Sequence, residues 1–250
     1  MRDTIVLIDK PSGWTSFDVV AKIRGQIRAG YRARGEKPTK RQLRVGHTGT
    51  LDPFATGLLI ILLGDATKRA DEFLKLDKVY EATLTLGATS TTGDPEGEIT
   101  SNLEFRISNS EENPSKDGNS IPNSKFKIPN SFPTLKEIQK ILEYFTGTIT
   151  QVPPAYSAIK IGGERAYKLA RAGKTVDMPS RQVTIYSLDL IDYTYPELRI
   201  RAHVSSGTYI RTLAEDIGSA LGTGAYCSTL RRTRVGDYCI DNAADISLVS

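Results

Sequence analysis

A glycine-rich stretch, residues 46–57, constrains the fold of this chain more than any other feature of its sequence. It contains three glycines and Pro53, and it runs directly into the longest apolar segment, residues 58–63, which Gly64 ends. Glycine adopts backbone conformations that are closed to other residues, and a short apolar run bounded by glycine is typical of a buried strand. The sequence therefore predicts a tightly constrained loop that leads into a buried sheet.

The same loop carries an acidic side chain, Asp52, immediately before Pro53. Proline disfavours the helical conformation of the residue before it, so Asp52 is expected to be extended. A carboxylate on a rigid loop beside a buried sheet is well placed for catalysis. Asp-Pro pairs also start ordinary turns, so the spacing alone leaves a catalytic and a structural role open.

The other segments indicate strands and helices without a regular alternation. Short apolar or alternating runs predict strands over residues 5–8, 80–86, 183–193 and 198–204. Apolar side chains at helical spacing predict helices over residues 16–27, 134–145, 163–172 and 208–221. The last two strands are expected to pair antiparallel. This pattern is typical of an α+β fold with a largely antiparallel sheet.

Two local details refine the helices. The first helix is expected to be capped by Thr15 or Ser16 and to turn Phe17 towards the interior. Thr134 and Glu137 form a capping box at the start of the second helix. Residues 30–44, which are basic and interrupted by glycine, are predicted to form a mobile loop.

The positive charge is unevenly distributed. The net charge is only +4, but residues 22–44 hold nine basic side chains and a single acid, Glu36. A second basic group consists of Arg231, Arg232 and Arg234. Such groups suit a polyanion, because each neutralised phosphate releases condensed counterions. A solvated charged surface is the alternative explanation.

Several protein classes are not supported. The two cysteines, Cys227 and Cys239, lie outside any Cys/His cluster, so no zinc or other metal site is expected. Reduced thiols fit a cytoplasmic protein. The longest apolar run is too short to cross a membrane, and the N-terminal residues lack the apolar core of a signal peptide.

Residues 106–133, rich in Asn, Ser, Pro and Lys, are expected to form a flexible insertion without a catalytic role.

The string GHTGTLDPFATGLL, residues 46–59, resembles the catalytic motif of the TruB family, the bacterial tRNA pseudouridine-55 synthases. Five further segments resemble motifs of this family and occur in the same order: residues 8–16, 78–80, 153–160, 206–213 and 230–232. The resemblance covers roughly residues 5–100 and 134–240. Six ordered motifs make it a specific signal.

The resemblance implies an enzyme that isomerises the T-loop uridine of tRNA, position 55, without a cofactor. It implies the pseudouridine synthase fold, a bent and mostly antiparallel sheet flanked by helices, with a central RNA-binding cleft. We expect one catalytic domain over residues 1–250 without a C-terminal PUA domain. The protein is expected to act as a cytoplasmic monomer, with tRNA as its partner and with neither a membrane nor an obligatory protein partner.

Three residues would carry the chemistry. Asp52 would be the nucleophile and would attack either the ribose or the uracil ring. Arg211 would pair with it, because a nearby guanidinium favours the ionised carboxylate. Tyr80 would stack on the flipped base and help remove the proton from carbon 5. Without the resemblance, an aromatic residue on an alternating strand is more often part of the core.

Other residues would bind the RNA or shape the pocket. His47 would enter the RNA where the uridine had been, although a loop-stabilising histidine is the simpler interpretation of the residue alone. The remaining candidates are pocket residues that could equally serve packing, and two possible RNA contacts: Lys10, Tyr209, Leu230, Thr67 and Lys68.

Two alternatives stay open. A protein that binds or folds RNA without catalysis could share the scaffold, although pure binding would need neither Asp52 nor Tyr80 nor Arg211. The guide-RNA-dependent branch of the superfamily is the second, but its members carry an extended C-terminal RNA-binding domain. Without a PUA domain, the basic residues 22–44 are expected to help hold the tRNA.

Overall fold

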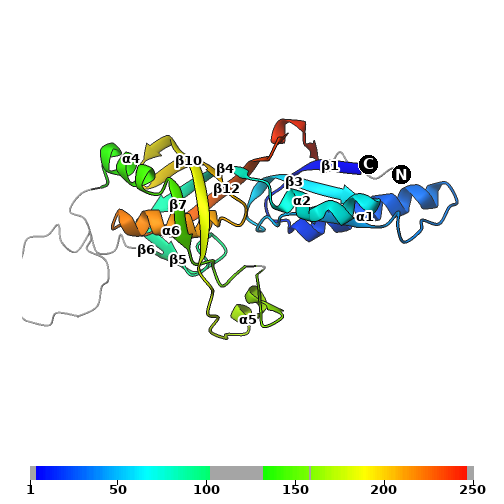
Figure 1. Ribbon diagram of the computed structural model, residues 1–250, viewed down its shortest axis with the longest axis horizontal. Coiled ribbons are helices and arrows are strands. Elements are labelled where there is room, and N and C mark those ends of the chain that lie inside the picture. Colours follow the sequence, from blue (N-terminus) through cyan, green and yellow to red (C-terminus); the bar gives the residue numbers. More distant parts are fainter. Residues whose placement is uncertain (1–3, 102–131, 158, 247–250) are drawn as a thin grey trace, which may run out of the picture.

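Ten strands form one long sheet that runs through the molecule (Figure 1). The structure, a computed structural model, describes residues 4–101, 132–157 and 159–246. The expected insertion over residues 106–133 therefore lies outside the described residues, except for its last two. The main path of the sheet is β14 (Ala244–Asp245), β1 (Thr4–Lys10), β3 (Thr56–Leu63), β12 (Ala225–Val235), β4 (Lys78–Leu86), β11 (Glu197–Val204), β10 (Arg181–Thr194) and β7 (Gly147–Gln151).

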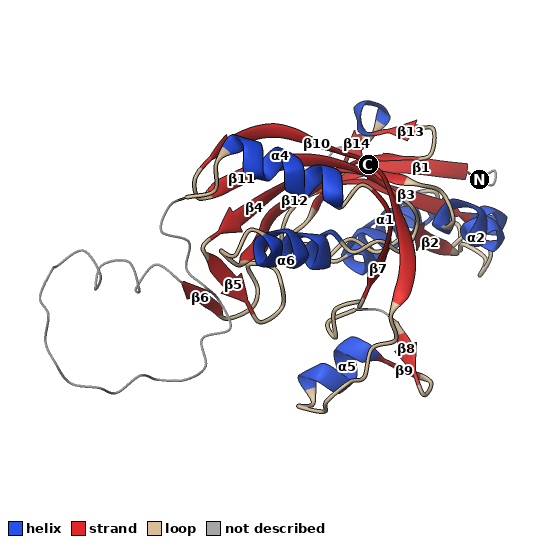
Figure 2. Ribbon diagram, turned by 60° about the vertical axis from the view of Figure 1, so that its left-hand side comes forward, coloured by secondary structure: helices blue, strands red, loops and turns tan. Residues whose placement is uncertain are grey.

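The sheet is mostly antiparallel and visibly bent, as β10 shows in Figure 2. Only β1 with β14 and β3 with β12 pair in parallel on the main path. Two short strands join from the side: β2 (Val45–Thr48), which pairs with β3, and β13 (Tyr238–Cys239), which pairs with β12. The predicted antiparallel pair of β10 and β11 is confirmed.

Helices flank the two ends of the sheet. At one end lie α1 (Ser16–Ala33) and α2 (Ala70–Leu74), and at the other lie α4 (Leu135–Tyr144) and α6 (Ile210–Ala220) (Figure 1). Between β7 and β10 the chain leaves the sheet and forms a projecting segment with β8 (Lys160–Ile161), β9 (Glu164–Arg165) and α5 (Ala166–Arg171) (Figure 2). Short 3-10 turns, Gly64–Arg69 and Ile240–Asn242, and a small hairpin, β5 (Ala88–Ser90) with β6 (Ile99–Ser101), complete the described elements.

Strand β3 is apolar throughout because both of its faces are covered. Leu59 and Ile61 pack with the buried side of α1, while Leu58 and Ile60 pack with Phe73 of α2. A strand covered on both sides reads as a continuous apolar run rather than an alternating one. Strand β4 alternates instead, with buried side chains at every second position.

The ends of the helices largely follow their sequence signals. Thr15 caps α1 together with Asp18, and Thr134 and Glu137 form the predicted capping box of α4. The expectation for Phe17 is wrong, because this side chain is 62% exposed in the first turn. Helix α1 also continues through residues 30–33, which were predicted to belong to a loop.

Strand β12 was not predicted. Its sequence, AYCSTLRRTRV, is mostly polar, and its pairing with β4 shifts register between Cys227 and Thr229 and again between Arg232 and Arg234. Each irregularity breaks the alternation of buried and exposed side chains, which is the signal that identifies a strand in a sequence. Among the described helices, none is both long enough and apolar enough to cross a membrane.

The backbones of β3 and β12 approach closely at Gly57, which pairs with Arg232. Gly57 has a φ of +103°, and a Cβ atom there would lie 2.3 Å from the carbonyl oxygen of Arg232. Only glycine fits this position. The buried side chain of Arg232 crosses the same junction, donating from Nε to the Leu58 oxygen at 2.7 Å and from Nη2 to the Gly49 oxygen at 3.1 Å.

We therefore expect Gly57→Ala to lower the free energy of unfolding by more than about 1 kcal/mol, because the new methyl group must push the two strands apart. Gly25→Ala is the control, since nothing lies within 4 Å of a Cβ atom at this position in α1. It should instead raise stability by about 0.5–1 kcal/mol, the helix preference of alanine over glycine. Urea denaturation measures both, and equal effects of the two substitutions would contradict the close approach.

Candidate active site

The loop that carries Asp52 is held by the N-terminal part of the chain. Leu51 N donates to Ser16 Oγ at 2.9 Å, and Ser16 Oγ donates back to the Leu51 oxygen at 3.2 Å. On the other side of Asp52, Gly13 N donates to the Pro53 oxygen at 2.8 Å. These bonds fix the backbone on either side of the carboxylate, and they explain why residues 8–16 and 46–57 form one structural unit.

Lys10 also holds the loop of Asp52 to the N-terminal part of the chain. Its side chain is fully buried, and Nζ donates to the carbonyl oxygens of Pro11 at 2.8 Å, Trp14 at 2.6 Å and Pro53 at 3.2 Å. Burial lowers its pKa to about 8, although the negative charge of Asp52 acts in the opposite direction. Lys10 lies outside the lining of the pocket described below, so its structural place is that of a loop anchor.

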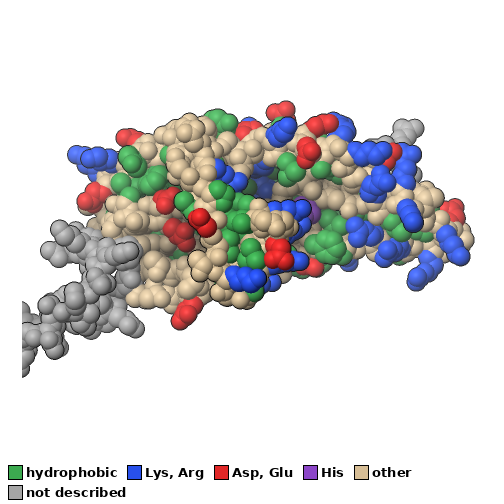
Figure 3. Space-filling view, turned by 60° about the horizontal axis from the view of Figure 1, so that its bottom comes forward, with side chains coloured by type: hydrophobic (Ala, Val, Ile, Leu, Met, Phe, Trp, Pro, Cys, Tyr) green, Lys and Arg blue, Asp and Glu red, His purple; other side chains and the backbone are tan. Residues whose placement is uncertain are grey.

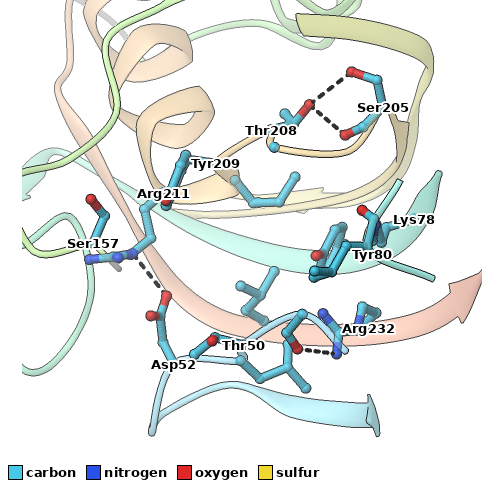
Figure 4. Close-up of a pocket in the computed structure, with 16 residues that line it drawn as sticks. Thr50, Asp52, Lys78, Tyr80, Ser157, Ser205, Thr208, Tyr209, Arg211 and Arg232 are labelled. Carbon is cyan, nitrogen blue, oxygen red and sulfur yellow. Dashed lines mark hydrogen bonds and ion pairs between the residues drawn. The ribbon is translucent and has the colours of Figure 1, made fainter. Parts of the chain in front are cut away.

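Arg211, in the first turn of α6, is the centre of the site. Its side chain is only 3% exposed, and Nε lies 3.0 Å from Oδ2 of Asp52 (Figure 4). Nη1 donates to Oδ2 of Asp94 at 3.0 Å and to the Thr92 oxygen at 2.8 Å. Nη2 donates to the Tyr156 oxygen at 2.8 Å. The guanidinium is thus fixed from several sides.

Asp94 is a site residue that sequence reasoning missed. It lies in a turn, where its carboxylate accepts from Thr92 Oγ1 at 2.6 Å and from Glu96 N at 3.0 Å. Nothing local in the sequence indicates that the other carboxylate oxygen faces Arg211. The buried guanidinium of Arg211 therefore lies between the carboxylates of Asp52 and Asp94 and is shared by both.

These surroundings act on Asp52 in opposite directions. Burial raises the pKa of Asp52, because the charged form loses hydration, and the charge of Asp94 raises it further. The cations of Arg211 and Lys10 lower it. The net pKa is raised, while 33% of the side chain remains exposed towards the pocket. Asp52 is therefore a partly buried carboxylate that is held beside a cation and accessible from the pocket.

The exposed side of Asp52 opens into a cavity of about 280 Å³. Five of the predicted residues line it: Asp52, Tyr80, Tyr209, Arg211 and Leu230. In Figure 4 the Asp52–Arg211 pair lies on one side of the pocket and Tyr80, from β4, on the other. Residues from a loop, two strands and the start of α6 thus converge, although they are far apart in the sequence.

Two cationic side chains of this pocket were not assigned a role from the sequence. Lys78 is buried, and its Nζ donates to the Leu74 oxygen at 2.7 Å and to the Leu76 oxygen. Burial lowers the pKa of Lys78 to about 8. Arg232 is the other, and its hydrogen bonds to the Leu58 and Gly49 oxygens hold it inside the protein. Of the second basic group, only Arg234 is exposed. Arg231 is also engaged, with Nη2 2.7 Å from Oδ2 of Asp9.

The remaining predicted residues lie elsewhere. His47, on β2, lines a second cavity of about 370 Å³ on the other side of Asp52, together with Arg165, Tyr167 and Arg171 of the projecting segment. Burial, and then the charges of Arg232 and Arg165, lower the pKa of His47, so the neutral ring is favoured.

Thr67 and Lys68 are in neither cavity. Thr67 Oγ1 donates to the Gly64 oxygen at 2.7 Å within its own turn, so this hydroxyl serves local structure. Lys68 is 68% exposed and lies 3.3 Å from Asp65. In the part of the chain that the structure describes, no three His, Cys, Asp or Glu side chains form a group suited to a metal ion.

Comparison with known families gives two matches that together span most of the chain. Residues 37–116 and 103–210 match the model described as TruB family pseudouridylate synthase, N-terminal domain. Residues 211–249 match the model described as tRNA pseudouridylate synthase B C-terminal domain.

Individual relatives agree over nearly the whole length. The tRNA pseudouridine synthase B of Thermobifida fusca is 40% identical over 98% of this chain and 74% of the relative. That of Bacteroides thetaiotaomicron is 41% identical over 98% of this chain and 90% of the relative.

Solved structures confirm the fold. A chain of a Cbf5-Nop10-Gar1 complex superposes with a TM-score of 0.62 at 25% identity, and one of an archaeal box H/ACA sRNP Nop10-Cbf5 complex with 0.60 at 22%. This chain spans about half of their length, 53% and 52%. The likeness confirms the predicted fold, a bent antiparallel sheet flanked by helices.

The contacts of Arg211 predict a strong energetic coupling with Asp94. Arg211→Met should lower the free energy of unfolding by about 3 kcal/mol or more, because it leaves buried carboxylates without their cation. Adding Asp94→Asn to this variant should recover part of the loss, whereas Asp94→Asn alone should destabilise the protein. A double-mutant cycle in urea measures this coupling, and purely additive effects would show that the two side chains act independently.

Proposed function

Because the chain belongs to the TruB family of pseudouridylate synthases, we propose that it converts the T-loop uridine of tRNA, position 55, into pseudouridine, with Asp52 as the nucleophile. The observation that supports this most directly is the ion pair of Asp52 with the buried Arg211, which opens into a pocket faced by Tyr80. The names of the relatives support tRNA as the substrate.

The proposed reaction rearranges one nucleotide. The target base is inaccessible in a folded loop, so it must be flipped out into the pocket. The bond between ribose carbon 1′ and uracil N1 breaks, and a bond between carbon 1′ and uracil carbon 5 forms. Carbon 5 loses its proton and N1 gains one. Product and substrate have the same composition, so the balance requires no external oxidant or reductant.

Asp52 would form the transient covalent bond, at the ribose or at the ring, that permits the base to turn. A carboxylate is an effective nucleophile when it is ionised and aimed. Arg211 supplies both conditions, since its charge favours the ionised carboxylate and its hydrogen bonds to Asp94 and to the Tyr156 oxygen fix the direction of the ion pair. The partial exposure of Asp52 leaves it within reach of a bound nucleotide.

The other walls of the pocket suit a flipped base. The Tyr80 ring, 9% exposed, would stack on uracil, and its hydroxyl group is the candidate acceptor for the carbon 5 proton. Leu230 and Tyr209 would close the pocket, with Tyr209 held by the Arg181 guanidinium 4.8 Å from its ring centre. Once a base fills the pocket, the apolar side chains in its lining would shield the intermediate from water.

The RNA around the target would contact residues outside this pocket. A neutral His47 is suited to occupy the place that the uridine leaves. Lys68 is exposed and can reach a phosphate, while Thr67 would support its turn. We further propose one catalytic domain over residues 1–250 that acts as a monomer in the cytoplasm. The continuous ten-stranded sheet supports the single domain.

The first prediction of this proposal concerns Asp52→Asn. A T stem-loop RNA labelled with tritium at uridine carbon 5 should lose its label with the native protein, and about a thousandfold or more slowly with the variant. RNA binding should persist, because the amide keeps the shape of the side chain. Asp71→Asn, an exposed carboxylate outside the pocket, should leave tritium release unchanged. Binding without tritium release by the native protein would favour the non-catalytic RNA-binding alternative.

The second prediction concerns pH. Activity requires ionised Asp52, so kcat/KM should fall as the pH drops through the raised pKa, above the ordinary value of about 3.9. Asp94 raises the pKa of Asp52, so Asp94→Asn should move this acidic limb to lower pH. A limb that stays in place, or moves to higher pH, would contradict the proposed electrostatic link.

A further inference from the structure

A group of exposed basic side chains on and after α1 has no role in either cavity. We call Arg28, Arg32, Lys37 and Lys40 the α1 basic face. All four are exposed, and within the described parts of the chain none forms an ion pair. Their neighbours differ: Arg41, Arg44 and Lys68 all lie within ion-pair distance of Asp65, at 2.9, 3.0 and 3.3 Å.

The stability of α1 does not explain this charge. Arg24, Arg28 and Arg32 recur every fourth residue, so they lie along one side of the helix, where like charges repel. After Asp18 the helix contains no acidic residue that would offset them. Arg32 lies in the last turn and complements the helix dipole, but Arg28 lies too far from the end to do so.

Arg24 links this face to the active site. Its Nε donates to the Leu43 oxygen at 3.2 Å, and Nη2 donates to the Val45 oxygen at 3.1 Å. These bonds hold the segment after α1 against the helix, directly before β2. Strand β2 carries His47 and leads into the loop of Asp52, so the segment that carries Lys37 and Lys40 is joined to the site through β2.

The length of α1 sets the distance between the α1 basic face and Asp52. The first turn of α1 lines the second cavity, which Asp52 also lines. The helix has 18 residues and is therefore about 27 Å long, so its far end lies roughly one helix length from the reacting base. Figure 3 shows Lys and Arg side chains gathered over the end of the molecule that α1 forms.

We infer that the α1 basic face binds the phosphate backbone of the RNA duplex beyond the target stem-loop, which in tRNA is the acceptor stem stacked on the T stem. The inference rests on the proposed function, which places the T loop at Asp52. Continuity with that site favours RNA. In residues 16–44, all described, Phe17 is the single exposed large hydrophobic side chain, and it lines the second cavity rather than the α1 basic face. A protein partner needs apolar or aromatic anchors, and a membrane surface needs an apolar face.

The test compares two charge reversals. Arg28→Glu/Arg32→Glu changes the α1 basic face, and Lys136→Glu/Lys140→Glu is the matched control on α4, at the opposite end of the molecule (Figure 1). Both pairs are exposed, lie four residues apart on a helix, and change the net charge equally. Binding and tritium release are measured with full-length tRNA and with the isolated T stem-loop at several salt concentrations, alongside thermal unfolding.

For the α1 variant we expect binding of full-length tRNA to weaken about tenfold or more at low salt, with a salt slope shallower by about 2, since two phosphate contacts are lost. Binding and tritium release with the stem-loop should match the native protein, and the α4 variant should match it with both RNAs. Thermal stability should change little, because relief of the like charges along α1 offsets the loss of the Arg32 charge at the end of the helix.

Three results would each overturn the inference: unchanged tRNA binding by the α1 variant, an equal loss with tRNA and stem-loop, or an equal loss in the α4 variant. Unchanged tRNA binding would instead leave the face to an acidic protein partner. A native protein that binds both RNAs but releases no tritium would contradict the proposed function, whereas the difference between the two RNAs in binding would still decide the role of the α1 basic face.

Discussion

The arrangement of the site depends on one buried guanidinium, that of Arg211. It joins four parts of the chain: α6, the loop of Asp52, the turn of Asp94 and, through the carbonyl of Tyr156, the projecting segment. The carboxylates of Asp94, which is buried, and Asp52, which is partly exposed, would repel each other without a shared cation. A single side chain therefore fixes the geometry of the site and opposes the rise in the pKa of Asp52 that burial and Asp94 cause.

Much of the fold could be predicted because the relevant signals are local. The apolar run of β3 reports burial on both faces, and the alternation in β4 reports burial on one. The capping box of Thr134 and Glu137 marks the start of α4 from four consecutive residues. Asp52, Tyr80, Tyr209, Arg211 and Leu230 were selected from ordered motifs, and the structure brings all five to one pocket. Their catalytic and binding roles remain proposals.

The features that sequence reasoning missed depend on contacts between distant segments. Asp94 meets Arg211 across 117 residues, and a turn rich in acids gives no sign of that partner. Strand β12 has a broken alternation because two register shifts change which side chains point inward. For Lys10 the sequence left a pocket role and a packing role open, because the three carbonyl oxygens that surround its ammonium group are backbone atoms of two separate segments. Phe17 was assigned to the interior from spacing alone, which fails in a first turn that the sheet does not cover.

The parallel pairing of β3 with β12 has a consequence for the synthesis of this protein on the ribosome. The strands meet at residues 57 and 232, and Arg211 also comes late in the chain, long after Asp52. Contacts between such distant residues form slowly and cannot precede the translation of the later partner. A nascent chain that has emerged only as far as α5 would contain the nucleophile without its guanidinium and without β10 to β14, five strands of the ten-stranded sheet. Nucleophile and counter-charge can therefore come together only after α6 has left the ribosome, which makes the assembly of the active site depend on the synthesis of α6.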